Sequence, residues 1–432
     1  MRLAVLLILA IALPLVALPR GAEETTPPED PSSLFGGAGY PASPVQFARS
    51  QIGPDPYFWP QICNVTIVDF DGDGLQDVVA CDGQRDAVLW YRQQVADGTT
   101  TWDEQVLGTD LATPAHATVV DIDADGDKDV VVSVLVNIMP DDRAIGSVVV
   151  LENTAAGFER HTVLDDVHRV ADAQPADFDG DGDVDLAVAV FGYQHGQVMY
   201  LENRGNWRFR RHDLLVAPGT IHVPVADYDG DGDPDIAAVV SQDEEEVWGF
   251  ENLGNGEFRN RRLWFTHNHD IGGAGLVSTD LDGDGDTDLL LPVGDNFEFS
   301  ISFPQPYHGC LWLENQGDWQ FATRRIAKFG GTYAAAPGDV DGDGDQDVVL
   351  VSMFNEFDKP GNGSIVWLEN NGAQEFKMWQ IDDTPTHLVT VACGDLDGDG
   401  RTDIVAGGLH IPRPHDRIGR ITAWRNVGQG AR

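Results

Sequence analysis

Aspartate recurs in this chain at a spacing that suits a divalent cation. Seven nine-residue segments have Asp at positions one, three, five and nine and Gly at position six. Hard cations such as Ca²⁺ bind six to eight oxygens, commonly from a loop with Gly at a sharp bend. We therefore expect about seven calcium sites. Their predicted ligands are Asp69, Asp71, Asp73 and Asp77; Asp121, Asp123, Asp125 and Asp129; Asp177, Asp179, Asp181 and Asp185; Asp227, Asp229, Asp231 and Asp235; Asp280, Asp282, Asp284 and Asp288; Asp339, Asp341, Asp343 and Asp347; and Asp395, Asp397, Asp399 and Asp403.

These loops differ from EF-hands, which have a bidentate Glu at position twelve. Position twelve is apolar here in every copy: Ala80, Val132, Val188, Ala238, Leu291, Leu350 and Ala406. It belongs to an apolar run that follows the loop, such as Val130-Val131-Val132. We interpret the loops mainly as structural staples rather than as signalling or catalytic sites.

A second set of reactive side chains lies five residues before the first Asp of each loop. The seven residues at this position are Asn64, His116, Asp172, His222, Gly275, Ala334 and Thr390. The candidate catalytic residues are His116, Asp172 and His222, which could hold an additional divalent transition metal or act as base and acid. The alternative is structural, because polar residues on the inner strands of a ring-shaped fold often only bind water in the channel.

The elements around each loop are short strands. A β-branched or aliphatic run precedes the loop and another follows it, which predicts an antiparallel pair. A third strand ends in a recurrent turn, as in Leu201-Glu202-Asn203, and a fourth begins at an aromatic residue such as Phe209. Four strands in about fifty residues is typical of a propeller blade. Residues 46–52 resemble a fourth strand without a first three, and the last repeat lacks a fourth. We therefore predict an all-β, seven-bladed β-propeller of four-stranded blades in which the N-terminal strand completes the last blade.

The repeats resemble those of the FG-GAP/VCBS family, which also form the propeller of integrin α-subunits. The sixth copy is nearest the FG-GAP form, with Phe329-Gly330-Gly331 before its loop, and the third is nearer the VCBS form. The resemblance covers about residues 44–432. It implies a calcium-binding propeller, but most copies lack the Phe-Gly element, so integrin-like adhesion is not implied. A fold of this kind says little about activity.

Strand direction divides the expected propeller into two faces. The aspartate loops and the turns between third and fourth strands share one face. The other face receives the variable loops 137–146, 292–309, 353–363 and 408–418. Binding residues concentrate on such loops. Further polar residues expected in segments leading to that face are His267, His269, Asp270, Tyr333, His387 and His410; aromatic residues expected there, for ligand stacking or for local packing, are Trp59, Phe297, Phe299, Phe303, Tyr307, Phe354 and Phe357.

The N-terminus has the pattern of a secretory signal peptide. Met1-Arg2 precedes an apolar run over residues 3–18 that is too short for a probable spanning helix. We expect residues 1–22 to be the signal peptide, 23–43 a flexible leader, and 44–432 the propeller of a secreted, periplasmic or cell-surface protein. In such a compartment Cys63 and Cys81 could form a disulfide across the first loop, or remain thiols. Cys310 and Cys393 are expected to be buried thiols.

The net charge of −44 makes nucleic acid and anionic membranes poor partners. Two functions remain. The first is a secreted, calcium-stabilised binding module for a polysaccharide or an extracellular surface protein. The alternative is a sugar-acting lyase or dehydratase with its pocket near His116, Asp172 and His222. The sequence leaves the oligomeric state open.

Overall fold

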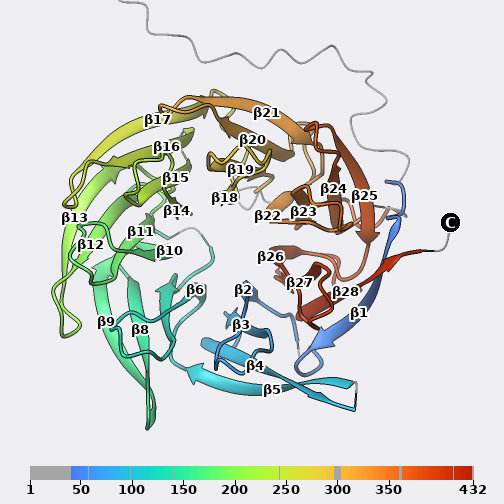
Figure 1. Cartoon of the computed structure of the whole chain (residues 1–432), viewed down its shortest axis with the longest axis horizontal. Helices are drawn as coiled ribbons and strands as arrows, with labels where there is room; N and C mark the ends of the chain where they lie inside the picture. The colour runs from blue at the N-terminus through green and yellow to red at the C-terminus, as the bar shows by residue number, and fades with distance from the viewer. Residues whose placement is uncertain are drawn as a thin grey trace, which may run out of the picture.

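Seven four-stranded antiparallel sheets are arranged around a central axis in the computed structural model of the chain (Figure 1). The structure describes residues 40–56, 58–97, 99–139, 141–242, 244–295, 303–359, 362–411 and 413–430. The all-β, seven-bladed fold predicted from the repeats is confirmed. Within the described ranges no helix is long and apolar enough to span a membrane. The predicted signal peptide and most of the predicted leader lie outside these ranges.

We number the blades I to VII in chain order, each from its innermost strand outward. Blade I comprises β2 (Ile62–Val68), β3 (Asp77–Asp82), β4 (Ala87–Ala96) and β5 (Thr99–Gly108). Blade II comprises β6 (Pro114–Val120), β7 (Asp129–Val134), β8 (Gly146–Thr154) and β9 (Gly157–Val167). Blade III comprises β10 (Arg169–Ala176), β11 (Asp185–Phe191), β12 (Gln197–Asn203) and β13 (Phe209–Val216). Blade IV comprises β14 (Val225–Ala226), β15 (Asp235–Ser241), β16 (Glu245–Asn252) and β17 (Phe258–Thr266).

The remaining blades follow the same order until the ring closes. Blade V comprises β18 (Val277–Thr279), β19 (Asp288–Val293), β20 (Gly309–Asn315) and β21 (Phe321–Ala327). Blade VI comprises β22 (Thr332–Gly338), β23 (Asp347–Ser352), β24 (Ile365–Asn370) and β25 (Phe376–Asp382). Blade VII comprises β26 (Leu388–Gly394), β27 (Asp403–Gly408), β28 (Ile421–Gln429) and, from the N-terminal end of the propeller, β1 (Val45–Ile52).

The second strand of each blade is a central strand of its sheet, and after its first residue, the position-nine aspartate, it is mainly apolar. In β7, for example, every residue is buried, whereas the outermost strand β9 of the same blade is largely exposed or half-buried. Side chains of adjacent blades interlock in clusters that cross the blade boundary, such as Val79 of blade I with Val132 and Leu151 of blade II. Burial on both faces explains why these strands read as continuous apolar runs rather than as alternating patterns.

The ring closes as predicted, with β1 paired antiparallel to β28 on the outside of blade VII. A buried Gln93 side chain of blade I also donates a hydrogen bond to the Leu396 carbonyl of blade VII (2.8 Å). Closure therefore gives the final blade its fourth, outermost strand. Residues before β1 also join the structure, because Ser43 N–H bonds the Gln380 carbonyl (2.9 Å) and Gln380 N–H bonds the Pro41 carbonyl (2.8 Å) of the predicted leader.

The four cysteines are free thiols. Cys63 and Cys81 lie on the paired strands β2 and β3, and burial raises the pKa of the Cys63 thiol to about 12. Cys310 is buried, as expected, while Cys393 is half-buried. None of the four has the lowered pKa of a reactive thiol.

Candidate functional site

Each aspartate loop is a tight backbone turn closed by its own first carboxylate. The Oδ2 atom of that residue accepts the N–H of the glycine at position six in all seven loops, at 2.8–3.1 Å. Positions four and six both have positive φ, a conformation that glycine adopts at little cost. Position four is Gly in six loops, and Ala124 takes the same conformation in loop II, with φ of 61°.

The aspartate at position nine ties the loop to the third strand of the blade. Asp235, which is fully buried, accepts the N–H of Tyr228 (2.9 Å) and the N–H of Asn252 (2.7 Å). The equivalent pair of bonds recurs in all seven blades, from Asp77, Asp129, Asp185, Asp235, Asp288, Asp347 and Asp403. Position nine therefore holds the blade together in addition to facing the loop.

The loops offer an all-oxygen ligand set of the kind calcium prefers. In loop I, carboxylate oxygens of Asp69, Asp71 and Asp77 lie within 4.8 Å of one another, and positions one, three and nine form the same group in loops II and III. The Oδ1 atoms of Asp69 and Asp282 are buried and have no hydrogen-bond partner. Buried carboxylate oxygens without a partner are costly unless a cation or a proton satisfies them. The residues present therefore fit calcium.

The aspartate at position five, also a predicted ligand, takes part in the backbone turn of the loop. It lies outside the groups formed by positions one, three and nine in loops I to III. Its Oδ1 accepts a hydrogen bond from the backbone N–H two residues later; Asp127 N–H, for example, donates to Asp125 Oδ1 at 2.9 Å. This bond shapes the turn that brings the other carboxylates together.

Loops I and VII carry arginine among their carboxylates. Arg92 contacts Asp71 (2.6 Å) and Asp73 (3.1 Å) in loop I. Arg401 pairs with Asp399 in loop VII, and Arg425 lies 3.5 Å from Asp397. A fixed positive charge beside a cation site reduces the electrostatic attraction for Ca²⁺. We therefore expect these two neighbouring loops to attract a cation less strongly than loops II to VI.

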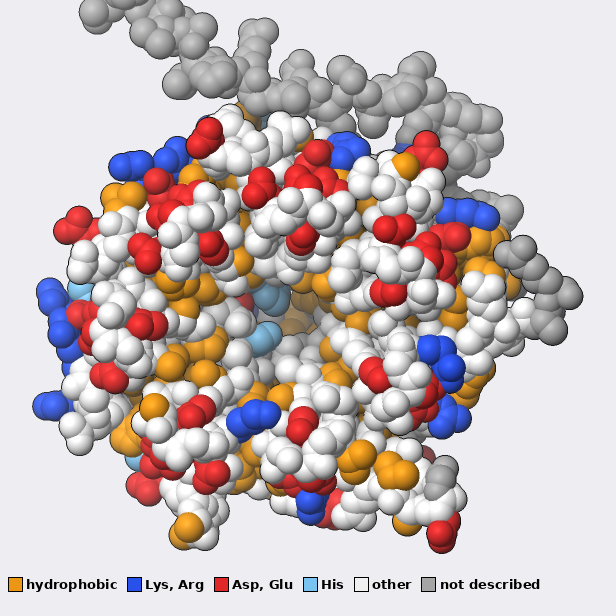
Figure 2. Space-filling model, viewed as in Figure 1, with side chains coloured by type: hydrophobic (Ala, Val, Ile, Leu, Met, Phe, Trp, Pro, Cys, Tyr) orange, Lys and Arg blue, Asp and Glu red, His pale blue; other side chains and the backbone are white. Residues whose placement is uncertain are grey.

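A cavity of about 470 Å³ lies in the central channel. Its walls are the first residues of the inner strands and the loops between second and third strands. They therefore lie toward the face opposite the aspartate loops. Figure 2 shows the acidic clusters gathered on the blades around the central hollow, with histidine side chains visible in its depth. The volume is typical of a site for a small ligand or for a single inserted group.

The structure brings His116, Asp172 and His222 together in the wall of this cavity. The Asp172 carboxylate is 2% exposed and lies between the two imidazoles, with Oδ1 3.3 Å from His116 Nδ1 and Oδ2 3.7 Å from His222 Nδ1. The two rings are perpendicular, with centroids 6.3 Å apart. Since both Nδ1 atoms face Asp172, the carboxylate orients the rings, and each Nε2 is without a hydrogen bond in the described part of the chain.

Asp172 is also held by the backbone and by a neighbouring amide. Its Oδ2 accepts the N–H of Val223 in blade IV (2.9 Å), and its Oδ1 accepts from Gln174 Nε2 (2.8 Å). Asn64 and Thr390, at the same position in blades I and VII, likewise accept the N–H of the next inner strand. The shared position therefore has a structural use, bridging adjacent inner strands, in addition to any role toward a ligand.

Burial and charge act in opposite directions on these groups. Burial alone would raise the pKa of Asp172, but the two imidazoles and the Val223 N–H outweigh it and hold the carboxyl pKa well below its usual range. Burial lowers the pKa of His116, although Asp172 opposes the shift. The arrangement is thus an ionised carboxylate beside a neutral imidazole, which can accept a proton at Nε2.

Other predicted residues are divided between the cavity and its surroundings. Asn64, Gly275, Ala334, Thr390, His269, Asp270 and Tyr333 line the cavity. His387 and His410 do not; both are buried, and their rings pack 5.4 Å apart. Burial lowers the pKa of His387 to about 3 and that of His410 to about 4. His267 packs against Phe265 at the outer strand of blade IV, so it also lies away from the cavity.

The aromatic loop residues have mixed environments. Trp59 is exposed and lies on His415, with centroids 4.5 Å apart, and Phe303 is exposed. Phe354 and Phe357 are buried, so they pack under their loop, and Tyr307 packs against the core of blades IV and V. Phe297 and Phe299 lie outside the described residues.

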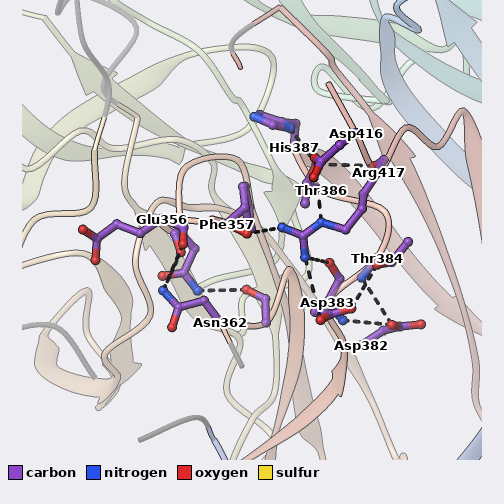
Figure 3. Close-up of polar contacts among 12 residues, drawn as sticks. Glu356, Phe357, Asn362, Asp382, Asp383, Thr384, Thr386, His387, Asp416 and Arg417 are labelled. Carbon is purple, nitrogen blue, oxygen red and sulfur yellow. Dashed lines mark hydrogen bonds and ion pairs between the residues drawn. The ribbon is translucent and has the colours of Figure 1, made fainter. Parts of the chain in front are cut away.

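Arg417, in the variable loop 408–418, contacts the variable loop 353–363 and the connector between blades VI and VII (Figure 3). Its guanidinium donates to the Asp383 carbonyl (2.9 Å) and to the Phe357 carbonyl. Its own carbonyl accepts the N–H of Thr386 (3.0 Å). These hydrogen bonds hold the loops of blades VI and VII together on this side of the propeller.

Sequence reasoning missed three charged residues of the cavity. Glu245, Asp295 and Arg169 line it together with the predicted Asp172 and Asp270. Burial raises the pKa of Glu245 to about 7, against the hydrogen bonds that it accepts from Gly273 N–H and the Ser241 hydroxyl. The Arg169 guanidinium donates to the carbonyls of residues 137–139. The described lining therefore holds four carboxyl groups and a single guanidinium.

Comparisons with known proteins agree with this architecture. A family profile described as an FG-GAP-like repeat matches residues 69–132, 177–238, 227–291 and 339–406, which include all seven aspartate loops and more than half of the chain. No curated protein matches the sequence.

Many solved structures share the fold, and two of them illustrate the similarity. One, a crystal structure of BBS1N in complex with ARL6DN soaked with lead, has a TM-score of 0.51 at 10% identity, covering 90% of this chain and 100% of that chain. The same complex soaked with mercury has a TM-score of 0.52 at 11% identity, covering 90% and 99%.

Proposed function

The chain belongs to the FG-GAP-like repeat family, and from that premise we propose that it is a secreted, calcium-loaded binding module that receives its ligand in the central cavity. The observation that carries the proposal is the cavity itself, with polar side chains from blades II, III, IV and V converging on one space. The seven aspartate loops would hold calcium through positions one, three and nine and would stiffen the ring around that space.

The charge of the cavity favours a ligand group that is cationic. Glu245, Asp270 and Asp295 all lie on its wall, and Asp172 lies deeper. Among the described lining residues Arg169 supplies the single guanidinium, whose Nη1 donates to loop carbonyls, so carboxyl groups outnumber cationic side chains. An acidic lining repels anionic groups and attracts cationic ones. We therefore assign an extracellular protein that inserts a lysine or arginine side chain as the ligand.

Two further observations support a protein ligand over an acidic polysaccharide. The net charge of −44 opposes the approach of any polyanion. The similar propellers BBS1N were crystallised with a protein partner, ARL6DN, which shows that this fold accommodates one. A neutral polysaccharide is the remaining alternative.

Calorimetric titration with a capped arginine tripeptide, in saturating calcium, tests the proposal. We expect binding that is lost in the Asp270→Asn/Asp295→Asn variant. The matched control is Asp165→Asn/Asp166→Asn, which removes the same charge from the outer strand β9. Equal weakening in both variants would show non-specific attraction to an acidic surface. Binding of a neutral oligosaccharide but not of the peptide would assign the cavity to a glycan instead.

A second candidate function is a sugar-acting lyase or dehydratase. The specific observation in its favour is Asp172 orienting both imidazoles, with the pKa of His116 lowered so that it is a neutral base. Proton abstraction by His116 Nε2 from a sugar carbon would begin an elimination. Incubation with a polysaccharide panel, followed at about 235 nm for unsaturated products, tests this. Product formation that survives in His116→Ala would contradict the assignment of the base.

A further inference from the structure

Three segments converge beside the cavity on the face opposite the aspartate loops. They are the β7–β8 loop with Asp142, the connector between blades II and III with His168, and the β11–β12 loop with His195. Their potential ligand atoms, one carboxylate oxygen and one nitrogen from each imidazole, all lie within 4.8 Å of one another. No described residue of the aspartate loops belongs to this group.

The carboxylate is directed toward the histidines by its neighbours. His195 Nδ1 lies 2.6 Å from Asp142 Oδ2, and the N–H of Gln194 donates to Asp142 Oδ1 (3.0 Å). The adjacent Asp141 is paired with Arg143 (2.9 Å from Nε), so it does not compete. The imidazoles of His168 and His195 are stacked, with centroids 5.3 Å apart and planes inclined by 11°. Neither nitrogen of His168 makes a hydrogen bond within the described ranges.

The backbone that carries both histidines is held closely. A methyl group at Gly146 would collide with the His168 carbonyl, and one at Gly192 would collide with the His195 carbonyl. These contacts require glycine at both positions, and each one fixes a histidine backbone against the segment that contains the glycine. The His195 side chain itself is 64% exposed, so a fourth position is open to water.

We propose that Asp142, His168 and His195 form a site for a divalent transition metal of the Zn²⁺ class. Two imidazoles and one carboxylate are ligands that such metals accept, whereas calcium prefers oxygen alone. Small side-chain adjustments would bring the three atoms to the distances of about 2.0–2.2 Å that zinc requires. The site is separate from the aspartate loops and does not depend on the ligand assigned to the cavity.

A metal bound at this site would also affect the wall of the central cavity. Ile138, in the loop that carries Asp142, lines the cavity, and so does Tyr193, two residues before His195. A metal bound between these loops would clip the wall of the cavity across the boundary of blades II and III. Zinc would then stiffen this side of the entrance, while calcium stiffens the opposite face.

Titration of the untagged protein with ZnCl₂, in saturating calcium, tests the proposal. We expect one zinc ion per chain at micromolar affinity, and at least a tenfold loss of affinity in His195→Ala and in Asp142→Asn. The Co²⁺-substituted protein should show visible absorption bands that disappear in the same variants. Because His195 is exposed, its variant should retain the wild-type melting temperature in calcium, which checks that the fold is intact.

Two controls locate the metal. His161→Ala removes the ring from a different group, formed with Glu152 and Glu159, and should leave zinc binding unchanged. The double variant His116→Ala/His222→Ala should also leave it unchanged, since those residues line the cavity. Absence of zinc binding, or binding that His195→Ala does not weaken, would overturn the proposal. Loss of binding in either control alone would move the metal to that control's residues.

Discussion

Ala124 adopts a left-handed conformation that the other six loops assign to glycine. An L-residue pays roughly 1–2 kcal/mol for this conformation, while glycine costs about 0.5–1 kcal/mol through the entropy of the unfolded chain. We therefore expect Ala124→Gly to be neutral or to stabilise the protein by up to about 1 kcal/mol, measured by urea unfolding in calcium. The matched change Gly126→Ala, at φ of 99°, should destabilise by about 1 kcal/mol or more. Clear destabilisation by Ala124→Gly would contradict this account.

Glu245 should make the protein less stable as the pH rises. Burial raises its folded-state pKa from 4.5 to about 7. Above pH 4.5 the unfolded chain releases this proton more readily than the folded one, so stability falls up to about pH 7 and then levels off. Glu245→Gln removes the titration and keeps an acceptor for Gly273 N–H. We expect its free energy of unfolding to gain roughly 1–3 kcal/mol over wild type between pH 5 and 8.

The measurement is chemical unfolding at several pH values in saturating calcium. Glu257→Gln, at an exposed position of blade IV, is the matched control. A pH-independent difference between Glu245→Gln and wild type would refute the raised pKa. The difference between variant and wild type is the quantity compared, because acidic groups common to both proteins then cancel.

A residue of the cavity could be predicted from the sequence where it occupies a position that recurs in each repeat. His116, Asp172 and His222 were found because each lies five residues before a loop, and the loops fix the register of the inner strands. Glu245 and Asp295 lie at the edge of, or within, the connections between second and third strands, which vary in length, and only the folded ring shows that they share a cavity. Asp172 also shows what register alone does not reveal, since its oxygens serve a backbone N–H as well as two imidazoles.

At the scale of elements, a buried ion pair crosses the join between blades VII and I. Arg420, just before β28, donates to Asp82 (2.6 Å) and to the Tyr91 hydroxyl (2.6 Å) in blade I. Asp82 is 1% exposed. Removing one partner leaves a buried charge uncompensated, which costs about 3–5 kcal/mol. We expect Arg420→Met to destabilise by that amount in urea unfolding.

Two comparison variants interpret this result. Lys359→Met breaks an exposed pair with Glu356 and should cost less than about 1 kcal/mol. Arg420→Met/Asp82→Asn should recover part of the loss, because the uncompensated charge is gone. If Arg420→Met were as mild as Lys359→Met, the join would depend on the apolar packing between the two blades and the Gln93 hydrogen bond rather than on the ion pair.

Strands and closure could be predicted from sequence, and the detail of the loops could not. Each apolar run that follows an aspartate loop can be buried on both faces only as a central strand of a sheet that packs between two others. The unpaired strand-like segments at the two ends of the chain together complete one blade. The loops between second and third strands have no such repetition. Their contacts, such as Arg417 with the carbonyls of Asp383 and Phe357, join segments far apart in sequence and depend on the folded blades.

At the scale of the whole molecule, the loops lie around a single closed ring, so we expect calcium binding and closure to be coupled. Position nine of each loop is bonded to the third strand of its blade, as Asp347 is to Asn370 (2.8 Å). The Asn370 side chain in turn donates to the Leu281 carbonyl in the loop of the previous blade (3.4 Å). A loop that opens therefore disturbs its own blade and the adjacent one. Asn252, Asn315 and Asn426 make the same link to the previous blade, so we expect the loops of blades III to VII to respond to calcium cooperatively.

Removal of calcium should accordingly lower the melting temperature in a single cooperative step. Extracellular calcium sites often have Kd values of about 10⁻⁴–10⁻³ M. A calcium concentration 100 times Kd contributes about 2.7 kcal/mol per site. Loops II to VI have a fifth aspartate, whereas Arg92 and Arg401 lie in loops I and VII, so we expect five tighter sites and two weaker ones. Calorimetry with and without chelator, and equilibrium dialysis for stoichiometry, would measure this.

Arg92→Gln is the variant that isolates the charge effect. It should tighten one weak site, since Asp71 and Asp73 would then face calcium without a competing guanidinium. Arg259→Gln, which breaks an exposed pair with Glu251 on the outside of blade IV, is the control and should leave calcium affinity unchanged. Magnesium should replace calcium poorly, because it requires a stricter octahedral geometry at shorter distances. A melting temperature that chelation does not change would show that the carboxylates form the ring without a metal, and the calcium sites proposed for all seven loops would then be withdrawn.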